Sequence, residues 1–212
     1  MTISLERTEA IATDGMEMAE QEEPTLDELF ERLENSVPEG YKFEIVGGTI
    51  IMSPQRAAHW ETIADIYEQL RTRYPRKRVM SDVRVDFPGK LNGFASDVLA
   101  IAEGSAKDAN DRWHYQDIEF VAEVVSASTA GNDYGAKKKA YAEAGIPVYV
   151  IADPYIGLCR VFTQPQNGEY KGDLTVPYGE PIDLTGTVVD LTLTTDEFPR
   201  QGSAARETSP AE

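Results

Sequence analysis

The sequence is poor in the residues that build disulfides and zinc centres. It contains a single cysteine, Cys159, and two histidines, His59 and His114. One cysteine excludes an internal disulfide and a cysteine-rich zinc cluster, and two histidines argue against a multi-histidine zinc site. Any metal that the protein uses is therefore expected to bind through oxygen ligands.

Long apolar segments are also missing. No run approaches the roughly 18 uninterrupted apolar residues of a membrane-spanning helix, and the N-terminus lacks the basic and then apolar regions of a signal peptide. We therefore expect a cytoplasmic protein with no membrane partner. The sequence also has no P-loop, no dinucleotide-binding glycine fingerprint and no internal repeat.

The net charge of −17 argues against a polyanionic partner, because phosphate binding depends on Lys and Arg. The charge is uneven, however: residues 1–40 contain 12 acids and 2 bases, whereas residues 41–199 contain 23 acids and 16 bases. One basic segment stands out as a candidate DNA-binding surface, with a solvated helix end and turn as the alternative. Its bases are Arg71, Arg73, Arg76, Lys77 and Arg78.

The chain is expected to form one domain over residues 24–199. Residues 1–23 lack apolar periodicity and contain seven acids, which predicts a disordered acidic tail, and residues 200–212 predict a second disordered tail. Within the domain, patterning predicts helices at 24–34 and 58–74, a hairpin at 41–54, a helix that Asp133 caps, and strands at 79–87, 94–101, 120–125, 148–153, 158–164, 169–178 and, with a helical turn, within 182–198. This order predicts a mixed α/β fold with a central sheet flanked by helices.

Two carboxylates interrupt apolar strands. Asp97 and Glu123 would each cost several kcal/mol if buried without a partner, and two carboxylates close together in a dry site must share a proton or a cation. Lys137 and Tyr141 lie four residues apart on one face of the following helix. The three charged residues predict a site for a hard divalent ion such as Mg²⁺. In the alternative, Asp97 caps a turn, Glu123 pairs with Lys137 and no reaction is catalysed.

From Phe94 to Pro154, a strand with Asp97 is followed by EVVSAST (residues 123–129), DYGAKKKAY (133–141), GIPVY (145–149) and ADP (152–154). These motifs resemble those of the Uma-two family of restriction-endonuclease-like proteins, within the PD-(D/E)XK nuclease superfamily. Upstream, FEIVGG and MSP followed by His59 also match. The resemblance covers about residues 25–197 and is specific, since several motifs occur in the right order.

The resemblance implies a restriction-endonuclease-like fold and a Mg²⁺- or Mn²⁺-dependent endodeoxyribonuclease, a hydrolase that cuts DNA phosphodiester bonds as a homodimer. It implies that Asp97, Glu123 and the backbone carbonyl of Val124 bind the metal. Lys137 would orient water or stabilise charge, because Val125 stands where the superfamily usually has its lysine. Ser96 replaces the usual proline before Asp97, a position that contributes no ligand.

Four further residues are candidates for supporting roles, each with a structural alternative. Glu44 is either a third carboxylate near the metal or a surface acid of the hairpin. His59 either contacts a phosphate or caps its helix, and Ser126 either orients Glu123 or caps the next helix. Tyr141 is expected to pack in the core with a hydrogen-bonded hydroxyl.

Two other functions remain open on the sequence. The acidic charge of residues 41–199 favours a nuclease-fold module that binds or assembles without catalysis. A small-molecule hydrolase would use the same carboxylates, although no feature of the sequence points to it specifically.

Overall fold

The computed structural model describes residues 2–3, 23–34, 36–38, 40–54, 57–127 and 129–201. Most of the two predicted tails lies outside these residues. The parts of the tails that the structure does describe are Glu23, Arg200, Gln201 and strand β1 (Thr2–Ile3), which pairs antiparallel with β3 (Thr49–Pro54). The disorder predicted for the rest of the two tails stays a prediction.

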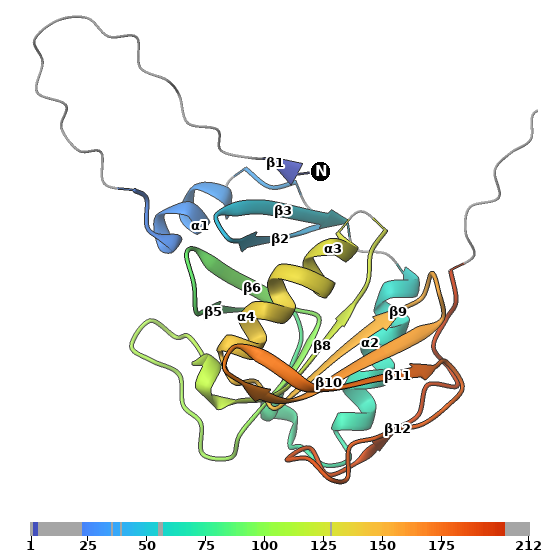
Figure 1. Ribbon diagram of the computed structural model, residues 1–212. Helices are drawn as coiled ribbons and strands as arrows, with labels where there is room; N and C mark the ends of the chain where they lie inside the picture. The colour runs from blue at the N-terminus through green and yellow to red at the C-terminus, as the bar shows by residue number, and fades with distance from the viewer. Residues whose placement is uncertain are drawn as a thin grey trace, which may run out of the picture.

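The strands form two main sheets (Figure 1). The first has the order β1-β3-β2-β6-β5, with β2 at Tyr41–Val46, β6 at Asn92–Ser96 and β5 at Val83–Phe87. The second has the order β11-β10-β9-β8-β7-β4, with bounds Glu169–Pro177, Leu158–Gln166, Val148–Asp153, Ile118–Val124, Val98–Ile101 and Val79–Met80. Strands β8 and β9 are parallel and the other pairs of this sheet are antiparallel. This mixed sheet is the expected centre of the fold.

Helices cover both faces of the second sheet (Figure 1). Helix α2 (Ala57–Leu70) packs Ile63 and Ile66 on one face, against the even-numbered residues of β8. On the other face lies a helix made of α3 (Ala130–Asn132), a π-helical turn η3 (Asp133–Lys137) and α4 (Lys138–Glu143). Its Tyr141 packs against Val121 and Tyr149. Side chains alternate along a strand, so Glu123 points to this second face.

One hairpin runs through both sheets. The pairing Val83↔Ser96 in the first sheet continues as Met80↔Leu99 in the second, with the same register on either side of a break. The break lies at Asp82, whose φ of +55° is left-handed, and at Asp97 opposite. The strands predicted at 79–87 and 94–101 are therefore each split in two, because the hairpin bends from one sheet into the other at these aspartates.

Helix α1 (Leu26–Glu34) covers the first sheet. Its start is a capping box: the Thr25 N–H donates to Glu28 Oε2 over 2.8 Å, and the Glu28 N–H donates to Thr25 Oγ1 over 3.3 Å. Phe30 packs with residues of β2 and β3 in a core of its own. The predicted hairpin of these two strands is also confirmed, and its turn residues have the positive φ that a tight hairpin turn requires.

Two local predictions differ from the structure. The helix after β8 begins at Ala130, so Asp133 is its fourth residue and not its cap. Residues 182–198 contain the short strands β12 (Ile182–Asp183) and β13 (Thr192–Leu193) in place of a long strand and a helical turn. The described parts of the chain also contain two 3₁₀ turns, η1 (Arg76–Arg78) and η2 (Tyr115–Asp117). No helix within the described residues is long and apolar enough to cross a membrane.

The contact between α1 and β6 gives a stability prediction. A Cβ atom on Gly93 would lie 2.5 Å from Phe30 Cε2, and the Phe30 ring also has the Arg84 guanidinium carbon 3.8 Å from its centroid. We expect Gly93→Ala to lower the free energy of unfolding by about 1–3 kcal/mol, the usual cost of overpacking. Gly131→Ala is the control, because a Cβ there meets nothing within 4 Å and alanine favours a helix. Denaturant titrations that gave both variants the same stability would contradict this packing.

Candidate active site

The bend of the hairpin brings Asp97 and Glu123 face to face. Strand β7 pairs with β8 through Val98↔Ala122, and the next step of this register sets Asp97 opposite Glu123. Each carboxylate accepts from the backbone of the other segment: the Val124 N–H donates to Asp97 Oδ2 over 2.8 Å, and the Asp97 N–H approaches Glu123 Oε2 at 3.4 Å. Both residues are buried: 4% of the surface of Asp97 and 2% of the surface of Glu123 is exposed.

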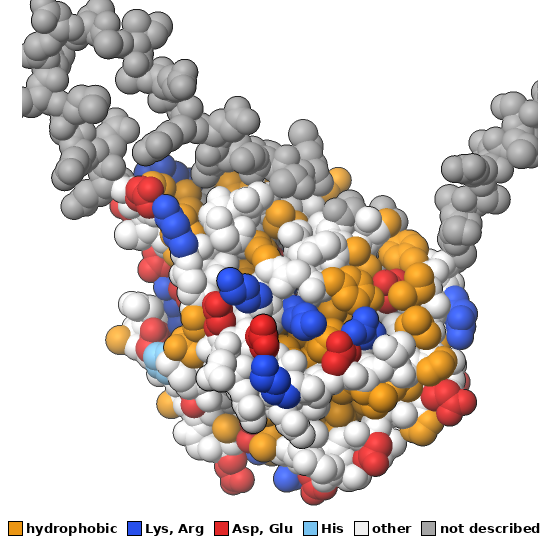
Figure 2. Space-filling model, in the orientation of Figure 1, with side chains coloured by type: hydrophobic (Ala, Val, Ile, Leu, Met, Phe, Trp, Pro, Cys, Tyr) orange, Lys and Arg blue, Asp and Glu red, His pale blue; other side chains and the backbone are white. Residues whose placement is uncertain are grey.

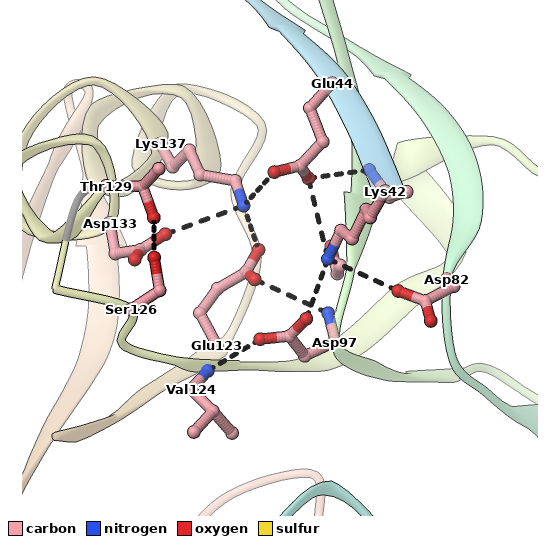
Figure 3. Close-up of polar contacts among 12 residues, drawn as sticks. Lys42, Glu44, Asp82, Asp97, Glu123, Val124, Ser126, Thr129, Asp133 and Lys137 are labelled. Atoms are coloured by element: carbon pink, nitrogen blue, oxygen red, sulfur yellow. Dashed lines mark hydrogen bonds and ion pairs between the residues drawn. The ribbon is translucent and has the colours of Figure 1, made fainter. Parts of the chain in front are cut away.

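Lys137 reaches these carboxylates from the helix (Figure 3). Its Nζ lies 2.7 Å from Glu123 Oε1, 3.0 Å from Glu44 Oε2 and 3.6 Å from Asp133 Oδ1. The residue is 2% exposed. Lys137 lies in the π-helical turn, two turns into the helix. Such turns are frequent at functional sites.

Lys42 reaches the carboxylates from the opposite side, on β2 (Figure 3). Its Nζ lies 2.7 Å from Asp97 Oδ1, 3.4 Å from Asp82 Oδ1 and 4.0 Å from Glu44 Oε1. Glu44 therefore lies between the two lysines, and it also accepts the Ala95 N–H over 2.8 Å. The site thus contains two ammonium groups, each within ion-pair distance of three carboxylates.

Neutral and titratable partners complete the contacts of the two central carboxylates. His59 Nε2 lies 3.0 Å from Asp97 Oδ2. The Tyr141 hydroxyl donates to Glu123 Oε1 over 2.6 Å and lies 3.0 Å from Ser96 Oγ. Tyr141 therefore packs in the core with a hydrogen-bonded hydroxyl, as the sequence predicts.

Burial and neighbouring charges shift the pKa values of the site's carboxyl groups in opposite directions. Burial alone would raise the pKa of Asp97, but Lys42 and His59 outweigh burial and lower it. Burial raises the pKa of Glu123, with Lys137 acting against that rise, and burial raises the pKa of Asp133 well above its ordinary value. The pKa of Lys137 is raised although burial opposes this, because its carboxylate partners favour the charged form. Asp97 thus ionises much more readily than Glu123.

The carboxylate oxygens of the site are the type of ligand that a hard divalent cation prefers. An ionised carboxylate has about four lone-pair sites on its two oxygens. Within the described residues, Asp97 Oδ1 contacts Lys42 and Glu123 Oε2 contacts the Asp97 N–H, so each of these oxygens retains a free lone pair. No group of three or more His, Cys, Asp or Glu side chains in the described ranges is arranged to hold a metal. The donor set is therefore a carboxylate pair, and Mg²⁺ typically uses one or two carboxylates with water and phosphate oxygens.

These residues line a cavity of about 330 Å³. All three central residues, Asp97, Glu123 and Lys137, contribute to its wall, as do Glu44 and the other candidates His59, Val124 and Ser126. The Ser126 hydroxyl lies 2.6 Å from Thr129 Oγ1 and, among the described residues, makes no hydrogen bond to Glu123. Thr129 precedes the helix, and neither side chain makes a capping hydrogen bond to it.

The basic segment lies at the other end of α2. At about 1.5 Å of rise per residue, Arg71 is roughly 18 Å along the helix axis from His59, and none of the five bases lines the cavity. Two of them also make internal contacts: Arg71 donates to the Tyr74 carbonyl, and Arg78 donates to the Ile101 carbonyl over 2.7 Å and to Glu119 over 3.2 Å.

Lys42, Asp82 and Asp133 belong to the site in the structure but were not predicted from the sequence. Two signals were available in the sequence. Lys42 and Glu44 lie two apart on one predicted strand and so share a face, and Asp133 lies four residues before Lys137. Asp82 becomes visible only once the hairpin register is known.

Comparison with known proteins shows the fold and the family of the chain. The fold is similar to the crystal structure of a "putative nuclease belonging to DUF820" from Anabaena variabilis, with a TM-score of 0.64 and 16% sequence identity, over 83% of this chain and 98% of that chain. No curated protein matches the chain. Residues 27–196 match the model of the Uma2 family, which is described as "Putative restriction endonuclease". The chain therefore belongs to the Uma2 family, as its motifs predict.

Proposed function

We propose that this protein is a Mg²⁺- or Mn²⁺-dependent endonuclease that hydrolyses DNA phosphodiester bonds. The observation that supports this most directly is the buried pair of Asp97 and Glu123, with Lys137 2.7 Å from Glu123 Oε1, in a cavity of a restriction-endonuclease family member. Burying two carboxylates side by side lowers the stability of the fold. Binding of a divalent cation would explain why the protein has such a pair.

The residues of the site have distinct proposed roles. Asp97, Glu123 and the Val124 carbonyl would bind the metal, which when bound lowers the pKa of water and neutralises charge on the phosphate. Lys137 holds the attacking water or stabilises the negative charge that develops at phosphorus. His59 and Tyr141 position the two carboxylates through their hydrogen bonds. Glu44 keeps both lysine side chains directed into the cavity.

A second candidate function is a nuclease-fold binding or assembly module without turnover. The surface charge favours it, because basic side chains over α4, β10 and β11 are interspersed with acidic ones (Figure 2). Several of them are paired: Lys139 with Glu143, Arg160 with Asp173 and Lys171 with Glu169. Such a surface attracts DNA less than a continuous basic patch does. A homodimer stays a prediction for the nuclease, because cutting both strands takes two sites.

Substitution of Lys137 tests the proposed chemistry. We expect Lys137→Met to slow Mn²⁺-dependent nicking of supercoiled plasmid DNA at least about 100-fold, the usual effect of removing one group that stabilises developing charge. Lys139→Met is the matched control, because its side chain is 73% exposed on the same helix. Asp97→Asn, which preserves size, is expected to be equally inactive. Folded Lys137→Met protein that nicked as fast as Lys139→Met would contradict the role of Lys137.

Substitution of Lys42 tests charge compensation in the metal-free site. Lys42→Met leaves Asp97 without its closest cation, and we expect the free energy of unfolding in EDTA to fall by about 3 kcal/mol, as for a broken buried ion pair. The same change removes a positive charge beside Asp97, so Mn²⁺ should bind more tightly in a calorimetric titration. Lys171→Met, with a surface ion pair, should change neither quantity measurably. Weaker Mn²⁺ binding by Lys42→Met would show that Lys42 does not compete for Asp97.

A further inference from the structure

Trp60 is an exposed aromatic residue at the cavity. It lies in α2 directly after His59, and 59% of its surface is exposed, the largest exposed fraction among the large hydrophobic residues that the structure describes. It lines the same cavity as Asp97 and Glu123. Single exposed hydrophobic residues are common on protein surfaces, but a tryptophan that lines a cavity offers a flat aromatic face to a group that enters it.

The cavity has two chemically different walls. One wall is charged: it contains the ammonium groups of Lys42 and Lys137 and five carboxylates, those of Glu44, Asp82, Asp97, Glu123 and Asp133. A phosphate can approach the two lysines once a divalent cation on Asp97 and Glu123 offsets the excess negative charge. The other wall is made by the start of α2, where Trp60 and Ile63 present apolar surface. A ligand that matches both walls has an anionic group at one end and a flat apolar group at the other. A nucleotide has this composition, with its phosphate and its base.

The depth of the charged wall limits the form of nucleic acid that fits. Asp97, Glu123 and Lys137 are only 2–4% exposed, so a phosphate must enter the cavity to reach them. In a regular duplex the bases are stacked and paired inside the helix, where an aromatic side chain cannot stack on them unless they are unstacked or flipped out. A single strand exposes both the phosphate and the faces of its bases, and stacking on aromatic residues is the common way in which such strands are bound.

We propose that the cavity accepts one unpaired nucleotide of a single-stranded or locally unpaired nucleic acid, with its base stacked on Trp60 and its phosphate directed towards Lys42 and Lys137. The volume of about 330 Å³ suits one small organic group and not a length of duplex. This inference rests on the proposed function for the reaction, but the binding mode does not require cleavage and is tested separately.

The test measures binding without catalysis. A fluorescently labelled 12-nucleotide single strand and its duplex are titrated with the protein at low salt, where contacts to phosphate are strongest. The titration is done in EDTA and again in Ca²⁺, a hard cation for the carboxylates, and anisotropy gives the dissociation constants. We expect the single strand to bind more tightly than the duplex. Trp60→Ala should weaken single-strand binding about 5- to 150-fold, the range found for loss of one stacked base. Trp60→Phe, which keeps an aromatic face, should lose less.

A matched control and a second readout separate stacking from general effects. Leu174→Ala removes another exposed hydrophobic residue, on β11 and outside the cavity, and should leave binding unchanged. The sequence has only two tryptophans, so in a Trp113→Phe variant the emission comes from Trp60 alone. We expect its fluorescence to be quenched when the single strand binds and to be much less affected by the duplex.

Three results would overturn the proposal: no binding of the single strand, binding of the duplex at equal or higher affinity, or equal affinity of Trp60→Ala and the parent protein. A Trp60 that binds a protein partner instead of a nucleotide would give the first of these. Failure of the nuclease proposal looks different, because the single strand would still bind and quench Trp60 while no DNA is cut with Mn²⁺.

Discussion

The organising constraint of this protein is the burial of Asp97 beside Glu123. Two carboxylates facing each other away from water repel and lose hydration, so positive charge must be brought to them. Each sheet and helix around the site contributes to that requirement: β2 provides Lys42, the π-helical turn provides Lys137, and α2 provides His59. The hairpin bends at Asp97 itself, so the two sheets meet at the cluster of charged side chains around Asp97 and Glu123.

A cluster of buried ion pairs is a poor way to gain stability. Replacing such pairs with apolar residues is often neutral or stabilising in other proteins, and the surrounding cores of Ile63, Phe94 and Tyr149 show that this chain packs apolar side chains well. The carboxylates also differ in the ease with which they ionise, a pattern typical of functional sites. Both features favour a site kept for chemistry over one kept for stability.

The sequence predicted the parts of the site that depend on local pattern. An acid inside an apolar strand, such as Glu123, is conspicuous, and so is a lysine that shares a helix face with Tyr141. The parts that it missed depend on long-range geometry. Lys42 reads as an ordinary polar residue of a hairpin until β2 is placed beside the bend. The bend itself results from the left-handed backbone at Asp82, which strand periodicity does not reveal. Asp133 was predicted to cap the helix because aspartate is a favoured N-cap residue, whereas the helix begins earlier, at Ala130, without a side-chain capping hydrogen bond.

The central claim is that Asp97 and Glu123 form the binding site of a divalent cation. Anomalous diffraction from crystals soaked in Mn²⁺ tests it most directly, since it locates the ion without reference to activity. The account predicts a Mn²⁺ peak between the two carboxylates, with Lys137 Nζ within about 4–6 Å, the range over which a charge strongly perturbs its neighbour. A crystal at millimolar Mn²⁺ with no peak there, and with Lys42 and Lys137 still in contact with Asp97 and Glu123, would contradict it.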